Sequence, residues 1–510
     1  MDVRIDETKM HCEDVAQVAR HGAKLHIDEA CLSEVDRCRT MLEEHLAAGD
    51  VMYGINTGIG ELADVTLDPS QIKEFQRKLV YSHAAGQGDP ASFEASRAAW
   101  TTRIKVLSHG HSGVRREVVA LMRDILNSGM APVMCVRGSV GACGDLSPMA
   151  QMALTLIGEG DVYLEEGKIV PAMEALSTKG LSSIEFEARD GLAAINGSNV
   201  ITGMGALQVV DVDNWIKTAD IAASMTMDAL LVNMISFDRR LHEIRGHVGS
   251  VTCARNILRV TEGSEILAQK NKKVQDAYSL RSTPQVQGPA RDVLAYARNA
   301  IETELNGVAD NPVFFPDEED VFYIPGANFQ GTPMAFGLEF LGTAVATVAA
   351  LSERRLNRLL NPNLSRGLPA FLTRNAGMNS GMMLTQYTAG ALVCESRVLT
   401  TPACHGSIPA AADQEDFVSM GLTTALKTRQ IIDHASAVLG IELLNAAQAL
   451  EFRKPLKPGK GVAAAMAIIR EHCEMLDEDK PLYNDINTMA RLVSEGVILR
   501  AVEEAIGTLE

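Results

Sequence analysis

The sequence lacks the cysteine and charge patterns of several large protein classes. Its nine cysteines stand singly without a CxxC pair, which indicates neither a zinc site nor a disulfide framework and fits a reducing cytoplasm. With 47 basic against 65 acidic residues, the formal net charge is −18. Nonspecific binding of nucleic acid or of an anionic membrane needs a basic face, so we expect neither partner.

Targeting, membrane and nucleotide-binding signals are also missing. The start MDVRIDETKM is too polar and acidic for a signal or transit peptide. The most apolar long window, near residues 220–235, contains Asp228, so a buried helix explains it better than a membrane span. The glycine-rich stretch 138–144 matches neither GxGxxG nor GxxxxGK[ST]. The 12 histidines include no HExxH, which leaves a metal-dependent hydrolase as a weak option.

Helical patterns are what the sequence does contain. Residues 201–235, 334–362 and 419–453 form three long stretches that are mostly apolar and nearly free of helix breakers. Helices longer than the usual ~8–20 residues are typical of bundles or of helical oligomer cores. Strand signals are few: a hairpin at 162–170 and a short strand at 321–324. The sequence therefore predicts a mainly α protein with a long-helix bundle.

The stretch GSVGACGDLSP has an unusual density of small residues. Glycines recur at every third position from 138 to 144, and Ala142 and Cys143 lie between the last two. A helix start is predicted at Ser147-Pro148, because serine caps helices and proline suits the first turn. The residue types alone are compatible with a plain tight turn, or with an anion site at the positive end of a helix.

This stretch resembles the signature GS[VI]GASGDL[AS]P of the aromatic amino-acid ammonia-lyase and aminomutase family. In that family an Ala-Ser-Gly triplet cyclises and loses water to give 4-methylidene-imidazol-5-one (MIO), a built-in electrophile. The resemblance implies that MIO forms autocatalytically from Ala142, Cys143 and Gly144. Small residues allow the close backbone approach that cyclisation needs, and no ordinary side chain is a strong electrophile.

Cys143 stands where the family has serine. Loss of hydrosulfide from cysteine yields the same dehydroalanine as loss of water from serine, and hydrosulfide is the better leaving group. We therefore expect MIO to form, with an uncyclised Ala-Cys-Gly turn as the alternative. Such a turn would fit a different class, a catalytically silent helical assembly protein that keeps the fold.

The resemblance extends from about Tyr53 to Arg453 and implies catalytic roles. YGINTGIG places Tyr53 at the family's catalytic base, and INGSN places Asn196 at the asparagine that hydrogen-bonds the MIO oxygen. The implied reaction is capture of the substrate amine by MIO and removal of a β-proton by Tyr53, giving an α,β-unsaturated acid and ammonia. A phenol acting as a base needs a lowered pKa, which we expect nearby positive charge and a helix dipole to supply.

Other stretches carry implied substrate contacts. VQDAYSLRSTPQVQGP contains Gln275, Tyr278 and Arg281, with the last two one helical turn apart. Tyr278 is assigned to the catalytic set, Gln275 to the lining of the substrate site, and Arg281 to the substrate carboxylate, which its guanidinium can grip as a fork. GANFQGTP places Phe329 against the substrate side chain.

Two positions indicate the substrate. LVYSHAAG places His83 behind a serine, as in histidine lyases, and DQEDFVS places Glu415 where histidine lyases have glutamate. Together they offer polar partners to both ends of an imidazole. RSTPQ and NFQGTP instead resemble other branches. L-histidine, converted to trans-urocanate, is therefore favoured. A tyrosine or phenylalanine ammonia-lyase and an aromatic 2,3-aminomutase remain alternatives.

The resemblance also implies the architecture. We expect an N-terminal region, residues 1–197, that carries the MIO turn, a central long-helix bundle over 198–453, and a C-terminal helical cap over 454–510. Family members are mainly α-helical homotetramers whose active sites combine several subunits, so Tyr53 and Arg281 need not serve one pocket within a single chain. No metal or diffusible cofactor is required, and the expected location is cytoplasmic.

Overall fold

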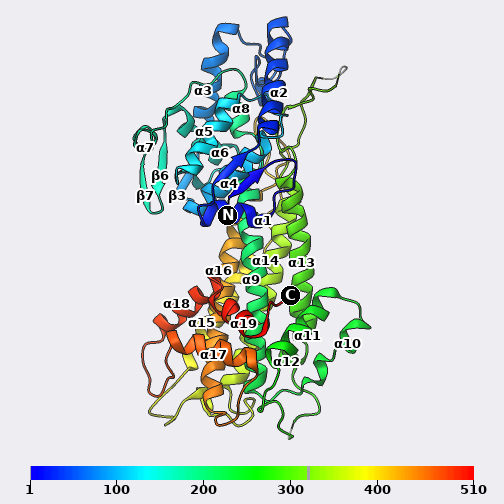
Figure 1. Ribbon diagram of the computed structural model, residues 1–510, viewed down its shortest axis with the longest axis vertical. Coiled ribbons are helices and arrows are strands. Elements are labelled where there is room, and N and C mark those ends of the chain that lie inside the picture. The colour runs from blue at the N-terminus through cyan, green and yellow to red at the C-terminus, as the bar shows by residue number, and fades with distance from the viewer. Residues whose placement is uncertain (1, 271, 319–321) are drawn as a thin grey trace. The chain divides into compact units, whose positions relative to one another are not determined.

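The computed structural model describes residues 2–270, 272–318 and 322–510, and within them nineteen α-helices dominate over nine short strands (Figure 1). The predicted mainly α fold is confirmed. Two compact units make up the chain. The first contains residues 1–210, 297–339 and 402–426, and the second contains 211–296, 340–401 and 427–510. Because these units are interleaved, they follow a different division from the three consecutive regions predicted above, which remain a prediction.

Four long helices each contribute to both units. They are α9 (Asn199–Ala229), α13 (Thr283–Leu305), α14 (Thr332–Leu360) and α16 (Gly421–Glu451). Three of them confirm the long helices expected from the sequence, whereas α13 continues through Pro289 and had not been predicted as a helix. Among the described residues, α14 alone is long and apolar enough to cross a membrane, and 61% of its most apolar window is buried, as in a protein core.

The first unit holds the remaining N-terminal helices. They are α1 (Cys12–Arg20), α2 (Glu29–Ala48), α3 (Ile72–His83), α4 (Phe93–Leu107), α5 (Arg116–Asn127), α6 (Leu146–Ala153), α7 (Ala172–Thr178) and α8 (Asp190–Ile195). Helix α4 is buried around its whole circumference from Ala95 onward, with α1 and α5 packed against it. Helices α3, α6 and α8 pack against one another. Their packing brings together the segments that carry His83, the glycine-rich turn and Asn196.

The strands of the first unit form small two- and three-stranded sheets. They are β1 (Val3–Ile5) with β2 (Leu25–Ile27), β3 (Gln87–Pro90) with β5 (Cys135–Arg137), β4 (Ala131–Pro132) with β6 (Asp161–Glu165) and β7 (Lys168–Pro171), and β8 (Val313–Phe314) with β9 (Tyr323–Ile324). The β6–β7 pair confirms the predicted hairpin. Strand β9 confirms part of the second prediction, and Val321 lies outside the described residues.

The described part of the second unit contains helices and loops but no strand. Besides its shares of the long helices it contains α10 (Arg239–Glu243), α11 (Val248–Val260), α12 (Tyr278–Arg281), α15 (Met383–Leu399), α17 (Lys460–His472), α18 (Tyr483–Ser494) and α19 (Val497–Ile506). Its core has a buried ion pair between Arg355 on α14 and Glu442 on α16, with Arg355 Nε 2.6 Å from Glu442 Oε1. Because both side chains are fully buried, this pair fixes the register of the two helix segments within the unit.

Candidate active site

The glycine-rich stretch forms a tight reverse turn between β5 and α6. Gly141 and Gly144 face each other as an isolated β-bridge, which puts Ala142 and Cys143 at the corner. Cys143 has a φ of 48°, in the left-handed region. A Cβ at Gly144 would overlap the carbonyl of Gly197 and lie 2.7 Å from Ser198 N, so only glycine fits this position. The turn is therefore compressed against a neighbouring segment.

Asp145 ties this turn to the start of α9. Its backbone N–H donates to Gly197 O at 2.8 Å, and Gly197 N donates to Cys143 O at 3.1 Å. The Asp145 carboxylate accepts hydrogen bonds from Ile201 N at 2.9 Å and Ser139 Oγ at 3.1 Å. Burial raises the pKa of this carboxyl to about 6. The Asp145 side chain thus accepts a hydrogen bond from the first turn of α9.

The structure corrects the predicted helix start. Helix α6 begins at Leu146, with Asp145 in the N-cap position, rather than at the serine–proline pair. Ser147 lies inside the first turn, and its buried Oγ has no hydrogen-bond partner among the described residues. The sequence predicts the serine as the cap because serine is a common N-cap residue. The contact of the Asp145 side chain with α9 appears only in the folded chain.

Five of the predicted residues line one cavity of about 400 Å³ in the first unit: Tyr53, His83, Cys143, Asn196 and Glu415. They come from the loop after α2, the end of α3, the glycine-rich turn, the end of α8 and the loop before α16. The segment bearing Glu415 is held near the turn by a hydrogen bond from Met420 N to Val140 O at 2.9 Å. Residues distant in sequence thus line one cavity.

The polar groups of this cavity are partly engaged with each other. The Cys143 thiol donates to Glu415 Oε1 at 3.2 Å, and Tyr53 Oη accepts from Gly60 N at 3.1 Å. The buried Oδ1 of Asn196 has no partner among the described residues. This amide oxygen can therefore accept a hydrogen bond from a group bound in the cavity.

The tautomer of His83 follows from its contacts. Its Nδ1 lies 2.7 Å from Leu79 O, and a carbonyl oxygen can only accept, so Nδ1 carries the hydrogen. In the neutral ring Nε2 is then an acceptor. The neighbouring Ser82 hydroxyl donates to the same carbonyl at 3.0 Å. The ring therefore offers a fixed lone pair to a ligand that carries an N–H group.

The expected lowering of the Tyr53 pKa is wrong for the single chain. Burial raises the pKa of this phenol, and the nearby Cys143 and Glu415 raise it further, although the hydrogen bond from Gly60 acts in the opposite direction. Burial likewise raises the pKa of the Cys143 thiol, with the Glu415 carboxylate adding to the shift. Both groups are thus held in their protonated forms, and the positive charge of Arg189, which lowers the pKa of Tyr53, is outweighed by burial.

Apart from Ala142 and Gly144 in the turn itself, four predicted residues do not line this cavity. Gln275, Tyr278 and Arg281 belong to the second unit, where Gln275 is exposed and Tyr278 and Arg281 form the single turn α12. The Arg281 guanidinium lies 4.6 Å from the centre of the Tyr278 ring, and its Nε donates to Asp276 O at 2.9 Å. Phe329 is half-buried in the first unit. The roles given to all predicted residues stay predictions.

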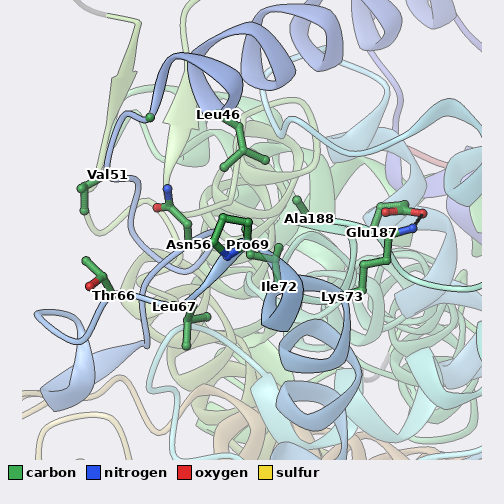
Figure 2. A pocket seen from close by; sticks show the side chains of 11 residues that line it. Leu46, Val51, Asn56, Thr66, Leu67, Pro69, Ile72, Lys73, Glu187 and Ala188 are labelled. Carbon is green, nitrogen blue, oxygen red and sulfur yellow. Dashed lines mark ion pairs between the residues drawn. The ribbon is translucent and has the colours of Figure 1, made fainter.

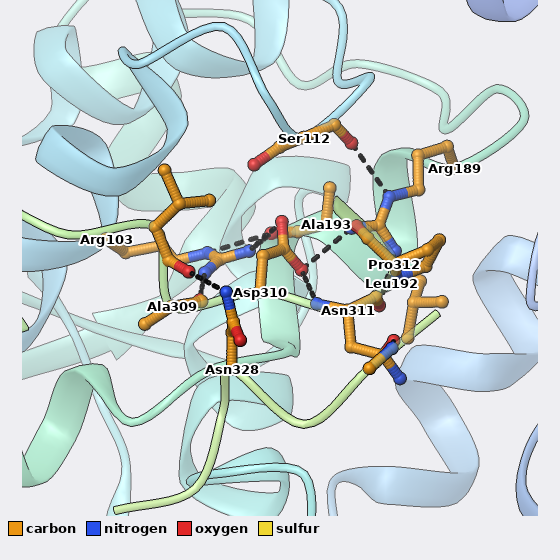
Figure 3. Close-up of polar contacts among 12 residues, drawn as sticks. Arg103, Ser112, Arg189, Leu192, Ala193, Ala309, Asp310, Asn311, Pro312 and Asn328 are labelled. Atoms are coloured by element: carbon orange, nitrogen blue, oxygen red, sulfur yellow. Dashed lines mark hydrogen bonds and ion pairs between the residues drawn. The ribbon is translucent and has the colours of Figure 1, made fainter. Parts of the chain in front are cut away.

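The sequence did not reveal a buried arginine–aspartate–arginine network beside the site. Figure 3 shows Asp310 between the guanidinium groups of Arg103 and Arg189. Asp310 Oδ1 lies 2.7 Å from Arg189 Nη2, and Oδ2 lies 3.2 Å from Arg103 Nη2. Arg103 also donates to Ala193 O and Ala309 O at 2.9 and 3.0 Å. It therefore holds α8, which ends at Ile195, directly before Asn196. The acidic residue in ADNPVF, residues 309–314, was the available signal in the sequence.

A second cavity of about 450 Å³ lies on another side of the Tyr53 loop (Figure 2). Its walls come from the end of α2, the loop and the start of α3, and include Leu46, Asn56 and Ile72. The Asn56 side chain is already used, because Oδ1 accepts from Met52 N and Nδ2 donates to Asp50 O, both at 2.7 Å. None of the predicted site residues lines this cavity, so it is not the site assembled above.

Comparisons with known proteins cover nearly the whole chain. Residues 10–471 match the family model described as aromatic amino acid lyase. The chain is 42% identical over 505 residues to a histidine ammonia-lyase of Alkaliphilus oremlandii, covering 99% of both chains. It is 44% identical over 498 residues to one of Symbiobacterium thermophilum, covering 98% of this chain and 97% of that one.

Solved structures share the fold at lower identity. A tyrosine aminomutase from Streptomyces globisporus superposes with a TM-score of 0.95 at 33% identity, covering 100% of both chains. A histidine ammonia-lyase from Trypanosoma cruzi gives a TM-score of 0.92 at 33% identity, covering 99% of this chain and 96% of that one. These matches extend over both units, including the residues of the cavity.

Proposed function

This chain belongs to the aromatic amino acid lyase family, and we propose that it eliminates ammonia from L-histidine to give trans-urocanate. It is an ammonia-lyase, a carbon–nitrogen lyase. The observation that carries the choice of histidine is the presence of His83 and Glu415 in one cavity with Tyr53 and Cys143. Relatives that are 40–44% identical over almost the whole chain and named histidine ammonia-lyases support the same choice.

The turn at residues 142–144 fits the MIO group on which this family generally depends. The cradle has no room for a side chain at Gly144, and the unused Asn196 amide oxygen lies in the same cavity as Cys143. Ala142, Cys143 and Gly144 would form the group, and Asn196 would hold it through its amide. When present, MIO supplies the electrophile that ordinary side chains lack.

The other residues of the cavity bind the substrate ring and limit the access of water. His83 Nε2 accepts a hydrogen bond from an imidazole N–H of the substrate, because Nδ1 is committed to Leu79 O. Glu415 is a second acceptor, so the pair suits an imidazolium ring with two N–H groups. Ile59, Leu62 and Leu192 line the cavity and limit the access of water.

Tyr53 receives the β-proton of the substrate. Because burial raises its pKa, the phenol needs a cation nearby before it can act as a base. The Arg281 guanidinium is our candidate, contributed to the site by another copy of the chain. The same side chain would bind the substrate carboxylate as a fork.

We further propose that the chain forms a homotetramer. Helix α15 has an apolar row whose members are all exposed and follow one another at spacings of three and four residues: Leu384, Tyr387, Ala391, Cys394 and Val398. That spacing is the pattern with which one helix packs along another. A second copy of the chain would cover the row. The nine free cysteines favour a cytoplasmic location.

An aromatic 2,3-aminomutase is the second candidate, favoured by the TM-score of 0.95 to a tyrosine aminomutase. One experiment separates the two. The purified chain is incubated with L-histidine, L-tyrosine or L-phenylalanine while absorbance follows the unsaturated acid and chromatography follows β-amino acids. The proposal predicts urocanate and ammonia from L-histidine alone. A β-amino acid as the main product, or no turnover of L-histidine, would refute it.

A further inference from the structure

The sulfur at the corner of the turn has one hydrogen bond to a side chain among the described residues. The Cys143 thiol donates to Glu415 Oε1 at 3.2 Å. Glu61 also lines the cavity, but the structure shows no bond between it and Cys143. A carboxyl group is therefore in contact with the atom that must leave if this turn is to become MIO.

We propose that Glu415 promotes maturation of the turn by delivering a proton to the departing sulfur of Cys143. The inference rests on the proposed cyclisation of Ala142, Cys143 and Gly144. It gives Glu415 a role before any substrate binds, in addition to the recognition role proposed above.

The chemistry balances without an oxidant or a reductant. Gly144 N forms a bond to the carbonyl carbon of Ala142, and the carbonyl oxygen leaves as water with the amide hydrogens of Gly144 and Cys143. At Cys143 the Cα–H and Cβ–Sγ bonds break while a Cα=Cβ double bond forms. Glu415 takes up one proton from solvent and gives it to Sγ, while the proton lost from Cα passes to solvent; the sulfur, which keeps its own hydrogen, leaves as hydrogen sulfide. Glu415 is within reach of Sγ for that last transfer.

The protonation state of the sulfur suits this step. Burial and Glu415 both raise the pKa of the Cys143 thiol, so the group stays protonated at neutral pH. With the proton from Glu415, a protonated sulfur leaves as neutral hydrogen sulfide, whereas a thiolate would leave as charged hydrosulfide. Once the sulfur has gone, Glu415 Oε1 loses that partner and becomes free to accept from substrate. The unmatured chain thus has its recognition carboxylate engaged.

The experiment follows maturation itself. Glu415→Gln and the control Glu61→Gln are made by cell-free translation alongside the unaltered chain. At timed intervals we would measure intact mass, trapped hydrogen sulfide, and thiols titrated after unfolding. The mature chain should lack one hydrogen sulfide and one water, and show one thiol fewer than its nine cysteines. Glu415→Gln should lose its sulfur on the order of 100-fold more slowly, and Glu61→Gln at the normal rate.

A chemical rescue guards against misfolding of the variant. Glu415→Ala should stay unmatured, and added acetate should restore loss of hydrogen sulfide by entering the vacated space, which a purely structural defect would not allow. Normal maturation of Glu415→Gln, or of Glu415→Ala without acetate, would overturn the inference alone and leave the proposed function intact. An unaltered chain that keeps nine thiols and its full mass would overturn the inference and the proposed MIO chemistry together.

Discussion

The His83 ring offers a test of substrate choice at the scale of a single residue. His83→Leu removes the Nε2 acceptor, so kcat/KM for L-histidine should fall about 10- to 100-fold, the effect of one hydrogen bond to a charged group. Tyr81→Phe on the same helix is the control, since that hydroxyl donates to Glu159 Oε1 at 2.6 Å and does not line the cavity. Steady-state kinetics measure both variants. Equal losses in the two would show that His83 does not contact the substrate.

Asp145 makes a prediction about pH, because its pKa is raised from 3.8 to about 6. Below about pH 4 the carboxyl is protonated in the folded and the unfolded chain, and its contribution to stability is fully present. As the pH rises toward 6 the unfolded chain releases the proton first, so the free energy of unfolding falls. Relative to Asp145→Asn, the unaltered chain should lose up to about 3 kcal/mol over this range.

Denaturant or thermal unfolding of both proteins from pH 4 to pH 7 measures this difference. A constant difference in stability across the range would mean that Asp145 is ionised in the folded protein at its ordinary pKa. Its contacts with the start of α9 would then be those of a carboxylate at every pH. A stability difference that falls as the pH rises therefore indicates the raised pKa of Asp145, and a constant difference indicates the ordinary pKa.

At the scale of elements, the network of Figure 3 holds α8 and predicts a positioning effect. Arg103→Lys and Arg97→Lys both remove a buried guanidinium from α4, and each should destabilise by about 3 kcal/mol. Arg97 donates to Val18 O, Leu126 O and Met130 O, away from Asn196. Only Arg103→Lys should therefore also lower kcat, by about tenfold or more. Melting temperatures and kcat report the two effects, and equal kcat values would contradict the positioning role.

The elements also show what the sequence could predict. Long segments without helix breakers predicted α9, α14 and α16. The resemblance of short motifs to those of the family indicated five side chains that the fold brings into one cavity. The Arg103 network could not be predicted, because α4 is buried on all sides and so has no apolar stripe that separates core from surface. The prediction of a lowered Tyr53 pKa was wrong for a related reason. This pKa depends on burial and on charges that only the folded chain brings close.

At the scale of the whole molecule, the apolar row of α15 predicts a subunit contact. Tyr387→Glu should dissociate the proposed tetramer, because a charge would be buried against a second copy. Tyr483→Glu on α18 is the control, since the two tyrosines are 63% and 64% exposed but only Tyr387 lies in the row. Light scattering after size exclusion measures the mass. Dissociation by both variants, or by neither, would argue against this surface.

Shared active sites lead to a stronger prediction. If Tyr53 and Arg281 serve one site from different copies, Tyr53→Phe and Arg281→Met should each be inactive, with kcat losses on the order of 10²–10⁴-fold for the base. Co-expressed, the two variants assemble at random, and about a quarter of the sites receive an intact tyrosine and an intact arginine. Ammonia release should recover to that extent. The double variant Tyr53→Phe/Arg281→Met, expressed alone, should show no activity. Absence of recovery in the mixture would mean that both residues serve the site of one chain, or that Arg281 does not belong to the site.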